Sequence, residues 1–264
     1  MSLELTPGRI TGVAGESGSG KTMTGLAVLG LLPAGARATG EVSFGGRNLL
    51  ELTSRSLRAI RGRDIAMVFQ DPSTSMHPMI RVGSQLADHM RLHLGLSRNA
   101  AKARACELLE MVSIPDPEGA LNKYPHQFSG GMRQRIAIAI ALACDPRVLI
   151  ADEPTTALDV TVQAGVLRLL RRLCDDLNVA MMLVTHDLGV MSAVADDVVV
   201  MRHGAVVETG TRFDVLTAPQ HPYTRELIES LPGNRIADPL THEDAASRDS
   251  RRTPAEAGGG ESDD

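Results

Sequence analysis

The chain has 264 residues, enough to bury a large core as one large lobe or two small ones. Its formal net charge at pH 7 is -5, and much of the acidic excess lies after Pro232, so the body of the chain is nearly neutral. This balance lacks the broad basic surface typical of nucleic-acid-binding proteins, and we expect no nucleic acid among the partners.

Strands and helices alternate along the chain as they do in proteins built on a parallel α/β sheet. In the first half, strands are expected at 9–13, 41–44 and 64–69, and helical patterns at 21–32 and 82–112. The second helical pattern is broken near Gly95, and Ser97 can cap the helix that follows. The helix-rich block at about 72–143 is therefore predicted to form a second lobe.

In the second half, strands are expected at 147–151, 180–185, 197–201 and 206–208, and helices at 160–177, 211–216 and 223–230. Beyond Pro232 the chain is rich in Gly, Ser and charged residues and poor in the apolar residues that offset the entropy of ordering. Residues 233–264 are therefore predicted to be a disordered acidic tail.

Three cysteines (Cys106, Cys144 and Cys174) are far apart in the sequence, so we expect neither a disulfide framework nor a zinc site, and a reducing cytoplasm fits. The N-terminal residues show no signal-peptide pattern. The longest apolar run, 136–144, is much shorter than the roughly 20 residues that cross a bilayer. We expect a chain that does not span a membrane but can lie against one through a partner.

A glycine-rich octet follows the first predicted strand and opens the first helix, matching the phosphate-loop pattern G-x-x-x-x-G-K-[ST]. Its glycines let backbone N–H groups and the helix start face the β-phosphate of a nucleotide. Lys21 is expected to reach the β- and γ-phosphates, and the Thr22 hydroxyl to bind Mg²⁺. The predicted phosphate-binding residues are Gly15, Glu16, Ser17, Gly18, Ser19, Gly20, Lys21 and Thr22.

Asp152 and Glu153 end the strand predicted at 147–151. Burying two carboxylates at the end of an apolar strand is costly unless they meet a cation or a reacting water. We predict that Asp152 holds Mg²⁺ through water and that Glu153 polarises the water that attacks in phosphoryl transfer. A simple acidic turn is the alternative.

His186 and Gln70 also stand at the ends of predicted strands. If strand order follows the sequence, His186 lies beside the Asp152 strand, where its imidazole could contact the γ-phosphate and orient the water. Gln70 offers an uncharged amide to Mg²⁺ and to the same water. A structural or solvated role is the alternative for His186.

Ser129, Gly130 and Gly131 open a helix that is expected to run to about residue 143. The start of a helix presents free N–H groups and a positive dipole end to an anion. Ser129 can also cap the helix, and the two roles are compatible.

In order and spacing these motifs resemble those of an ABC ATPase. The matching segments are 15–22 (Walker A), Gln70 (Q-loop), 129–134 (signature), 150–153 (Walker B), 155–159 (D-loop) and His186 (switch histidine). The resemblance implies an α/β P-loop NTPase with an inserted helical subdomain at about 72–143, inside an ATPase domain at 1–232. It further implies that Ser129, Gly130, Gly131, Gln134 and Asp159 help to bind ATP held by a facing subunit.

Three local strings narrow the resemblance to the ATP-binding subunits of oligopeptide, dipeptide and nickel importers: 70–78, 128–132 and 221–225. Such a subunit hydrolyses MgATP at the cytoplasmic face of the membrane. It works with two transmembrane permeases, a second ATPase subunit (identical or different) and, indirectly, an extracytoplasmic substrate-binding protein. Alternatives are an ATPase for nickel or another small solute, another ABC class such as an exporter, or a truncated ABC module with impaired ATP binding.

Two departures from that family qualify the resemblance. Relatives carry about thirty more residues before the phosphate loop, with two strands and an aromatic ring that stacks on adenine. Here fourteen residues precede Gly15 and none is aromatic. We expect either that the start of the chain is misassigned or that adenine is held in another way and more weakly. No cysteine follows Cys174, so an iron–sulfur site of the C-terminal region is not carried over.

Overall fold

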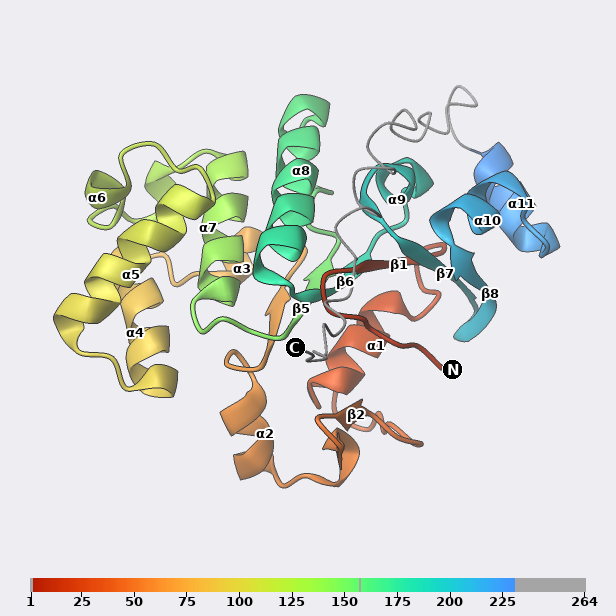
Figure 1. The fold of residues 1–264 in the computed structure, drawn as a ribbon, viewed down its shortest axis with the longest axis horizontal. Helices are drawn as coiled ribbons and strands as arrows, with labels where there is room; N and C mark the ends of the chain where they lie inside the picture. The colour runs from red at the N-terminus through yellow and green to blue at the C-terminus, as the bar shows by residue number, and fades with distance from the viewer. Residues whose placement is uncertain (1, 157, 231–264) are drawn as a thin grey trace, which may run out of the picture.

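A six-stranded sheet forms the centre of the computed structural model, which describes residues 2–156 and 158–230 (Figure 1). The strand order is β4-β5-β6-β1-β7-β8, with every neighbouring pair parallel except β7 and β8. The strands are β1 (Ile10–Ala14), β4 (Ile65–Val68), β5 (Val148–Asp152), β6 (Ala180–Val184), β7 (Asp197–Arg202) and β8 (Ala205–Thr211). The expected α/β class is confirmed.

Alternate residues of the strands pack into two different hydrophobic clusters, because successive side chains point to opposite faces of a sheet. Leu149 of β5 and Leu183 of β6 belong to one cluster, and Ile150 and Met182 belong to the other. Helices α8 (Val160–Leu177) and α9 (Leu188–Val194) lie on one side of the sheet, and α1 (Lys21–Val28) lies on the other (Figure 1). The central strands are therefore buried on both faces, as parallel strands require.

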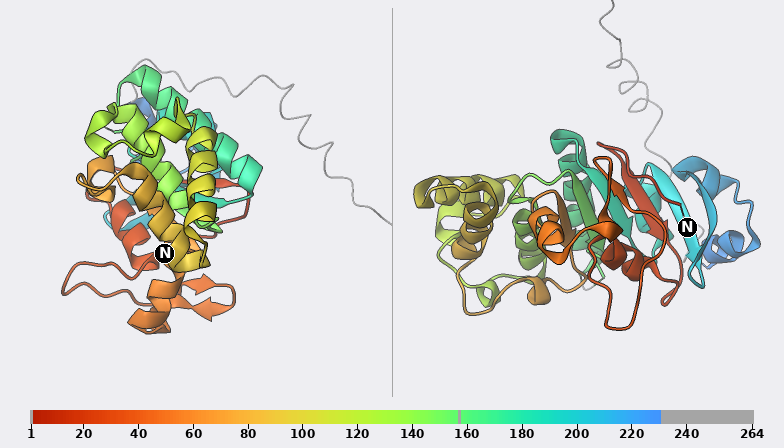
Figure 2. Two further views of the ribbon diagram at one scale, coloured as in Figure 1. Left: turned by 90° about the vertical axis from the view of Figure 1, so that its left-hand side faces the viewer. Right: turned by 90° about the horizontal axis from the view of Figure 1, so that it is seen from below.

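The helical block lies at the opposite end of the molecule from α10 (Arg212–Thr217) and α11 (Pro222–Glu229), as the yellow-green and blue ribbons of Figure 2 show. It comprises α3 (Pro72–Ser75), α4 (Val82–Leu94), α5 (Arg98–Met111), α6 (Pro117–Ala120), η2 (Pro125–Gln127) and α7 (Gly130–Leu142). These bounds lie within the predicted block at 72–143. Its apolar residues join the same cluster as one face of the sheet, so its standing as a separate subdomain stays a prediction.

Helix caps explain where several helices begin. The Ser97 hydroxyl accepts the N–H of Ala100 at 3.2 Å, and the Ser129 hydroxyl accepts that of Met132 at 3.3 Å. Each serine satisfies one of the free N–H groups at its helix start. The predicted helix starts after Ser97 and Ser129 are confirmed.

Several predicted bounds differ from the structure. Helix α1 ends at Val28 instead of residue 32, because Gly30 adopts a left-handed φ of +60° that interrupts the helix. The strand predicted at 41–44 is reduced to β2 (Ser43–Phe44), paired with β3 (Arg47–Asn48). The short elements η1 (Leu49–Glu51), α2 (Ser54–Ile60), α3, α6, η2 and α9 were not predicted.

The predicted disordered acidic tail at 233–264 lies outside the described residues. The segment 155–159 lies within them except for Ala157. Within the part of the chain that the structure describes, no helix is both long enough and apolar enough to cross a membrane.

The two buried thiols, Cys144 and Cys174, should make the stability of the fold depend on pH in the alkaline range. Burial raises the pKa of both Cys144 and Cys174 from 9.0 to about 11. The unfolded chain releases these protons above pH 9 while the folded protein keeps them, so the free energy of unfolding should fall between pH 9 and pH 11. The expected loss is about 2–3 kcal/mol per thiol, at 1.36 kcal/mol per pKa unit.

The measurement is urea unfolding at pH 8, 9, 10 and 11, compared with Cys144→Ala and Cys174→Ala variants. Each variant should lose its share of the alkaline slope. An unchanged slope in both variants would contradict the assignment.

Candidate nucleotide-binding site

The predicted site residues follow four parallel strands whose carboxyl ends meet at one edge of the sheet. The phosphate loop follows β1, Gln70 follows β4, and His186 follows β6. Asp152 is the last residue of β5, and Glu153 comes directly after it. The strand order places β5 between β4 and β6. The expectation that the strand before His186 lies beside the strand of Asp152 is therefore confirmed.

The phosphate loop is shaped by glycines at positions that reject a side chain. Gly15 has a φ of +146°, and a Cβ there would lie 2.2 Å from the carbonyl oxygen of Met201. Gly18 and Gly20 also have positive φ, at +81° and +99°. The Ser19 hydroxyl is buried and has no hydrogen-bond partner among the described residues. A backbone cradle with an unpaired donor beside a helix start fits the phosphates of a nucleotide.

The Lys21 ammonium lies inside this loop, with the residue only 4% exposed. Its Nζ donates to the carbonyl oxygens of Gly15 and Glu16, both at 2.8 Å. Burial lowers the pKa of Lys21, while the nearby carboxylates of Glu153 and Asp152 act in the opposite direction. The loop thus holds a partly desolvated cation next to its N–H groups, which favours an anion.

Thr22 and Asp152 form a pair of oxygen donors at the start of α1. The Thr22 hydroxyl donates to Oδ1 of Asp152 at 3.0 Å, and Asp152 is 4% exposed. Burial raises the pKa of Asp152; the hydrogen bond from Thr22 and the charge of Lys21 oppose this rise. A hydroxyl and a carboxylate are the hard oxygen ligands that Mg²⁺ takes, so the donor set fits that ion.

Glu153 is the point where the strand ends come together. Its carboxylate accepts hydrogen bonds from Gln70 Nε2 at 3.0 Å and from Thr156 Oγ1 at 2.9 Å, and Nδ1 of His186 lies 3.1 Å from it. Burial acts to raise the pKa of Glu153, but the contacts with His186, Thr156 and Lys21 lower it overall. Because an ionised carboxylate only accepts hydrogen bonds, the Nδ1 atom of His186 carries the proton in this contact.

The backbone of Glu153 is held in the left-handed region, with a φ of +46°. Its N–H donates to the carbonyl oxygen of Val184 at 2.9 Å, which ties the end of β5 to the end of β6. A non-glycine residue with this φ is costly by about 1 kcal/mol or more, and such strain gathers at functional sites.

The signature residues lie at the start of α7, packed against α8 rather than against the phosphate loop. A Cβ at Gly131 would lie 2.4 Å from Cγ1 of Val162, and one at Gly130 would lie 3.7 Å from Cδ2 of Leu158. Within residues 2–156 and 158–230, no hydrogen bond joins Ser129, Gly130 or Gly131 to the phosphate loop. The structure therefore brings together the Walker A, Q-loop, Walker B and His186 residues. Of the signature, Gly130 and Gln134 line a small pocket with Gln70, but they make no hydrogen bond to the phosphate loop in the part of the chain that the structure describes.

Gln134 and Asp159 are predicted to help bind ATP held by a facing subunit, a contact that one chain alone does not contain. Gln134 is 1% exposed, and its Nε2 atom has no partner among the described residues. The Asp159 carboxylate accepts the N–H of Val162 at 3.0 Å as the cap of α8. In this single chain the Gln134 side chain is buried and the Asp159 carboxylate caps α8, and the predicted contact of both residues with ATP stays a prediction.

Two residues of the site were not predicted from the sequence. Thr156 donates to Glu153, and the hydroxyl of Tyr223 accepts the N–H of Glu16 in the phosphate loop at 3.0 Å. Thr156 lies in the segment 155–159, which the sequence singled out only as a D-loop. Tyr223 lies in the string 221–225, which carried only the family resemblance.

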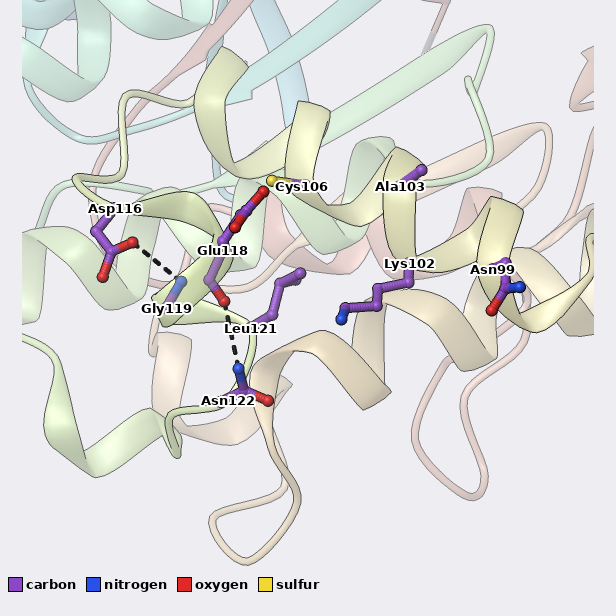
Figure 3. Close-up of a pocket in the computed structure, with 9 residues that line it drawn as sticks. All are labelled: Asn99, Lys102, Ala103, Cys106, Asp116, Glu118, Gly119, Leu121 and Asn122. Atoms are coloured by element: carbon purple, nitrogen blue, oxygen red, sulfur yellow. Dashed lines mark hydrogen bonds between the residues drawn. The ribbon is translucent and has the colours of Figure 1, made fainter.

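A separate cavity of about 600 Å³ opens between α5 and α6 and is lined by none of the motif residues above (Figure 3). Two hydrogen bonds join residues of its wall: the Gly119 N–H donates to Asp116 at 3.1 Å, and Asn122 donates to the Glu118 carbonyl oxygen at 3.4 Å.

Comparisons with known proteins agree with the geometry. The sequence profile described as "ABC transporter" matches residues 1–156, and the profile described as "Oligopeptide/dipeptide transporter, C-terminal region" matches residues 207–259. The probable peptide ABC transporter ATP-binding protein y4tR of Sinorhizobium fredii is 51% identical over 237 residues, covering 89% of this chain and 71% of the relative. The dipeptide transport ATP-binding protein DppD of Bacillus subtilis is 48% identical over 234 residues, covering 88% of this chain and 70% of the relative.

A solved structure described as a dimeric post-hydrolysis state of an ATP-binding cassette bound to ADP and Pi is also similar. It aligns with a TM-score of 0.69 and 29% sequence identity, over 80% of this chain and 88% of that chain.

Replacing Gly15 tests the shape of the cradle. Gly15→Ala should weaken nucleotide binding by about tenfold or more, because the new Cβ would displace the loop from the Met201 carbonyl oxygen. The measurement is a titration with a fluorescent ATP analogue. Gly35→Ala is the matched control, since Gly35 also has a positive φ (+89°) but nothing within 4 Å of its would-be Cβ. Equal affinities for Gly15→Ala and Gly35→Ala would refute this account of the loop.

Proposed function

Because the chain belongs to the ABC transporter family, we propose that it is the ATP-hydrolysing subunit of an importer of peptides. The family membership rests on the profile that matches residues 1–156 and on relatives about half identical in sequence. The profile at 207–259 and the relatives' names favour peptides over nickel or another small solute as cargo. We place the chain at the cytoplasmic face of the membrane, beside two permease subunits.

The observation that carries the proposal is the position of Glu153 at the sheet edge, beside the phosphate loop. One carboxylate meets an amide, a hydroxyl and an imidazole there, at 3.0, 2.9 and 3.1 Å. These groups come from the ends of neighbouring strands, so the orientation of the carboxylate is fixed by the sheet. In our proposal this carboxylate orients the water that attacks the γ-phosphate.

The lowered pKa of Glu153 keeps it ionised at neutral pH, ready to accept a hydrogen bond from water. Phosphoryl transfer passes through a loose transition state, in which positioning matters more than strong basicity. His186 holds one carboxylate oxygen through Nδ1, and its side chain is 54% exposed. Its Nε2 edge is our candidate for contact with the γ-phosphate.

We assign the remaining binding roles to the loop residues. The N–H groups of residues 15–20, together with Lys21, bind and orient the phosphates. Thr22, Asp152 and Gln70 hold Mg²⁺, which would supply charge neutralisation at the β- and γ-phosphate oxygens. The pairing of Thr22 with Asp152 at 3.0 Å supports this assignment.

The signature is proposed to act on a facing subunit. Ser129, Gly130 and Gly131 are separate from the chain's own loop, and the similar cassette structure is described as a dimer. Two chains would then sandwich two nucleotides, each between one chain's loop and the other's signature. The second ATPase subunit is a different chain or a second copy of this one, and an extracytoplasmic binding protein delivers the substrate to the permeases.

Contact with a permease is proposed for the segment that follows Gln70. Met79 is 75% exposed and Ile80 is 40% exposed just after it. Exposed apolar side chains of this kind suit a protein–protein contact. Movement of Gln70 with the nucleotide would then reach the permease through this segment.

Replacing Glu153 tests the catalytic assignment. Glu153→Gln keeps the shape of the side chain but removes its charge, so kcat for ATP hydrolysis should fall by about a hundredfold or more. The affinity for ATP should stay within about threefold, since we assign Glu153 to the water and not to the phosphates. The measurements are steady-state hydrolysis by the assembled transporter and ATP binding by the chain.

Glu118→Gln, in the helical block, is the control and should hydrolyse ATP at the original rate. If Glu153→Gln hydrolysed ATP as fast as the original chain, the mechanism would be wrong.

Replacing Ser129 separates its capping role from its role in the composite site. Ser129→Ala and Ser97→Ala each remove a cap and should each lower the free energy of unfolding by about 1 kcal/mol. Only Ser129→Ala should also reduce ATP hydrolysis by the assembled transporter, by about tenfold or more. Urea unfolding and hydrolysis are measured on both variants. Equal rates of ATP hydrolysis in the two variants would show that Ser129 only caps its helix and has no role in the composite site.

A further inference from the structure

The phosphate loop makes a hydrogen bond to α11, the last helix of the described chain. The hydroxyl of Tyr223, in α11, accepts the backbone N–H of Glu16 at 3.0 Å, across 207 positions of sequence. Tyr223 is 1% exposed, so its hydroxyl is held inside the fold, whereas Glu16 lies at the surface. A hydrogen bond to a buried side chain restricts the backbone that makes it, so the Tyr223 hydroxyl limits the movement of the phosphate loop at Glu16.

The surroundings of Tyr223 fix the position of its ring. Nδ1 of His221 accepts the Tyr223 N–H at 3.2 Å at the start of α11. The Glu208 carboxylate accepts the N–H groups of Gln220 and His221 at 2.7 and 3.1 Å, which ties this start to β8. The guanidinium carbon of Arg202 lies 4.5 Å from the centroid of the Tyr223 ring. An arginine over an aromatic face is a favourable cation–π contact.

The strands beneath Tyr223 touch the same loop. The Gly204 N–H donates to the carbonyl oxygen of Ser19 at 3.0 Å, in the turn between β7 and β8. The Met201 carbonyl oxygen lies where a Cβ of Gly15 would stand. The β7–β8 hairpin and α11 therefore contact the loop at its beginning and near its end. Loops that must present several N–H groups at once bind better when they are ordered beforehand.

We propose that Tyr223 is a positioning residue for nucleotide binding: its hydroxyl holds the Glu16 N–H and so orders the phosphate loop before ATP arrives. The proposal rests on the proposed binding of ATP by this loop. It gives the segment 221–225 a physical role that the sequence resemblance alone did not assign. Arg202 acts through the Tyr223 ring and does not touch the loop in the contacts described.

Tyr223→Phe is the sharpest variant, because it removes the hydroxyl and keeps the ring under Arg202. The chain has one other tyrosine, Tyr124, whose ring also lies near an arginine, with Arg81 at 5.9 Å. Tyr124→Phe is therefore the matched control. In the intact chain, Tyr223→Phe should raise the Kd for ATP by about fivefold, the size expected for one hydrogen bond. In the assembled transporter, KM should rise by a similar factor while kcat stays within about twofold.

A second readout needs no nucleotide. Amide hydrogen exchange at Glu16 in the ATP-free chain should be at least about fivefold faster in Tyr223→Phe than in the original chain or in Tyr124→Phe. Arg202→Met, which keeps the hydroxyl but frees the ring, should change exchange and Kd in the same direction. If Tyr223→Phe does not fold, the Arg202→Met variant still tests the proposal.

Unchanged exchange at Glu16 and unchanged Kd in Tyr223→Phe would overturn the proposal. An equal fall in kcat and in kcat/KM, with KM unchanged, would also overturn it, since a loop-ordering role acts on binding. An original chain that binds no ATP would instead refute the proposed function, and the exchange measurement would still decide whether Tyr223 orders the loop.

Discussion

The strained backbone of Glu153 is the constraint on which the rest of the site depends. Its φ of +46° turns the chain sharply at the end of β5, and its N–H bond to Val184 at 2.9 Å holds that turn against β6. The side chain thereby projects between Gln70 on one side and His186 on the other. Because β5 lies between β4 and β6, the strand order of the sheet dictates which groups meet the carboxylate.

The charged groups of the site are only partly compensated by the protein itself. Lys21 is buried and donates to the carbonyl oxygens of its own loop. Burial lowers the pKa of Lys21 and raises the pKa of Asp152, and both shifts disfavour the charged form of the side chain. A polyphosphate with a divalent cation would complement both, offering anionic oxygens to Lys21 and a positive charge to Asp152. Lys21 uses two of its three N–H donors on the Gly15 and Glu16 carbonyl oxygens, which fixes the ammonium in the loop and leaves one donor for a ligand.

Much of the fold and the chemistry of the site could be predicted because local patterns determine them. The bounds of α8 match the predicted helix at 160–177, since its apolar stripe and the capping Asp159 are both visible in the sequence. The octet at 15–22 and the acidic pair after β5 likewise carry their chemistry in their own order. What local patterns cannot show is which distant groups meet. The bond from Glu16 to Tyr223 depends on the packing of α11, and the burial of Gln134 depends on which face of α7 turns inward.

We propose that one chain holds only half of each catalytic site, with the signature at the start of α7 serving a facing subunit. The most direct measurement is the specific ATPase activity of the purified chain over a range of concentrations, alone and with the second ATPase subunit. The oligomeric state is determined by sedimentation at each concentration. Activity per chain should rise in step with the fraction of chains that are paired. A monomeric chain that hydrolyses ATP at the same specific activity as the dimer would contradict the account.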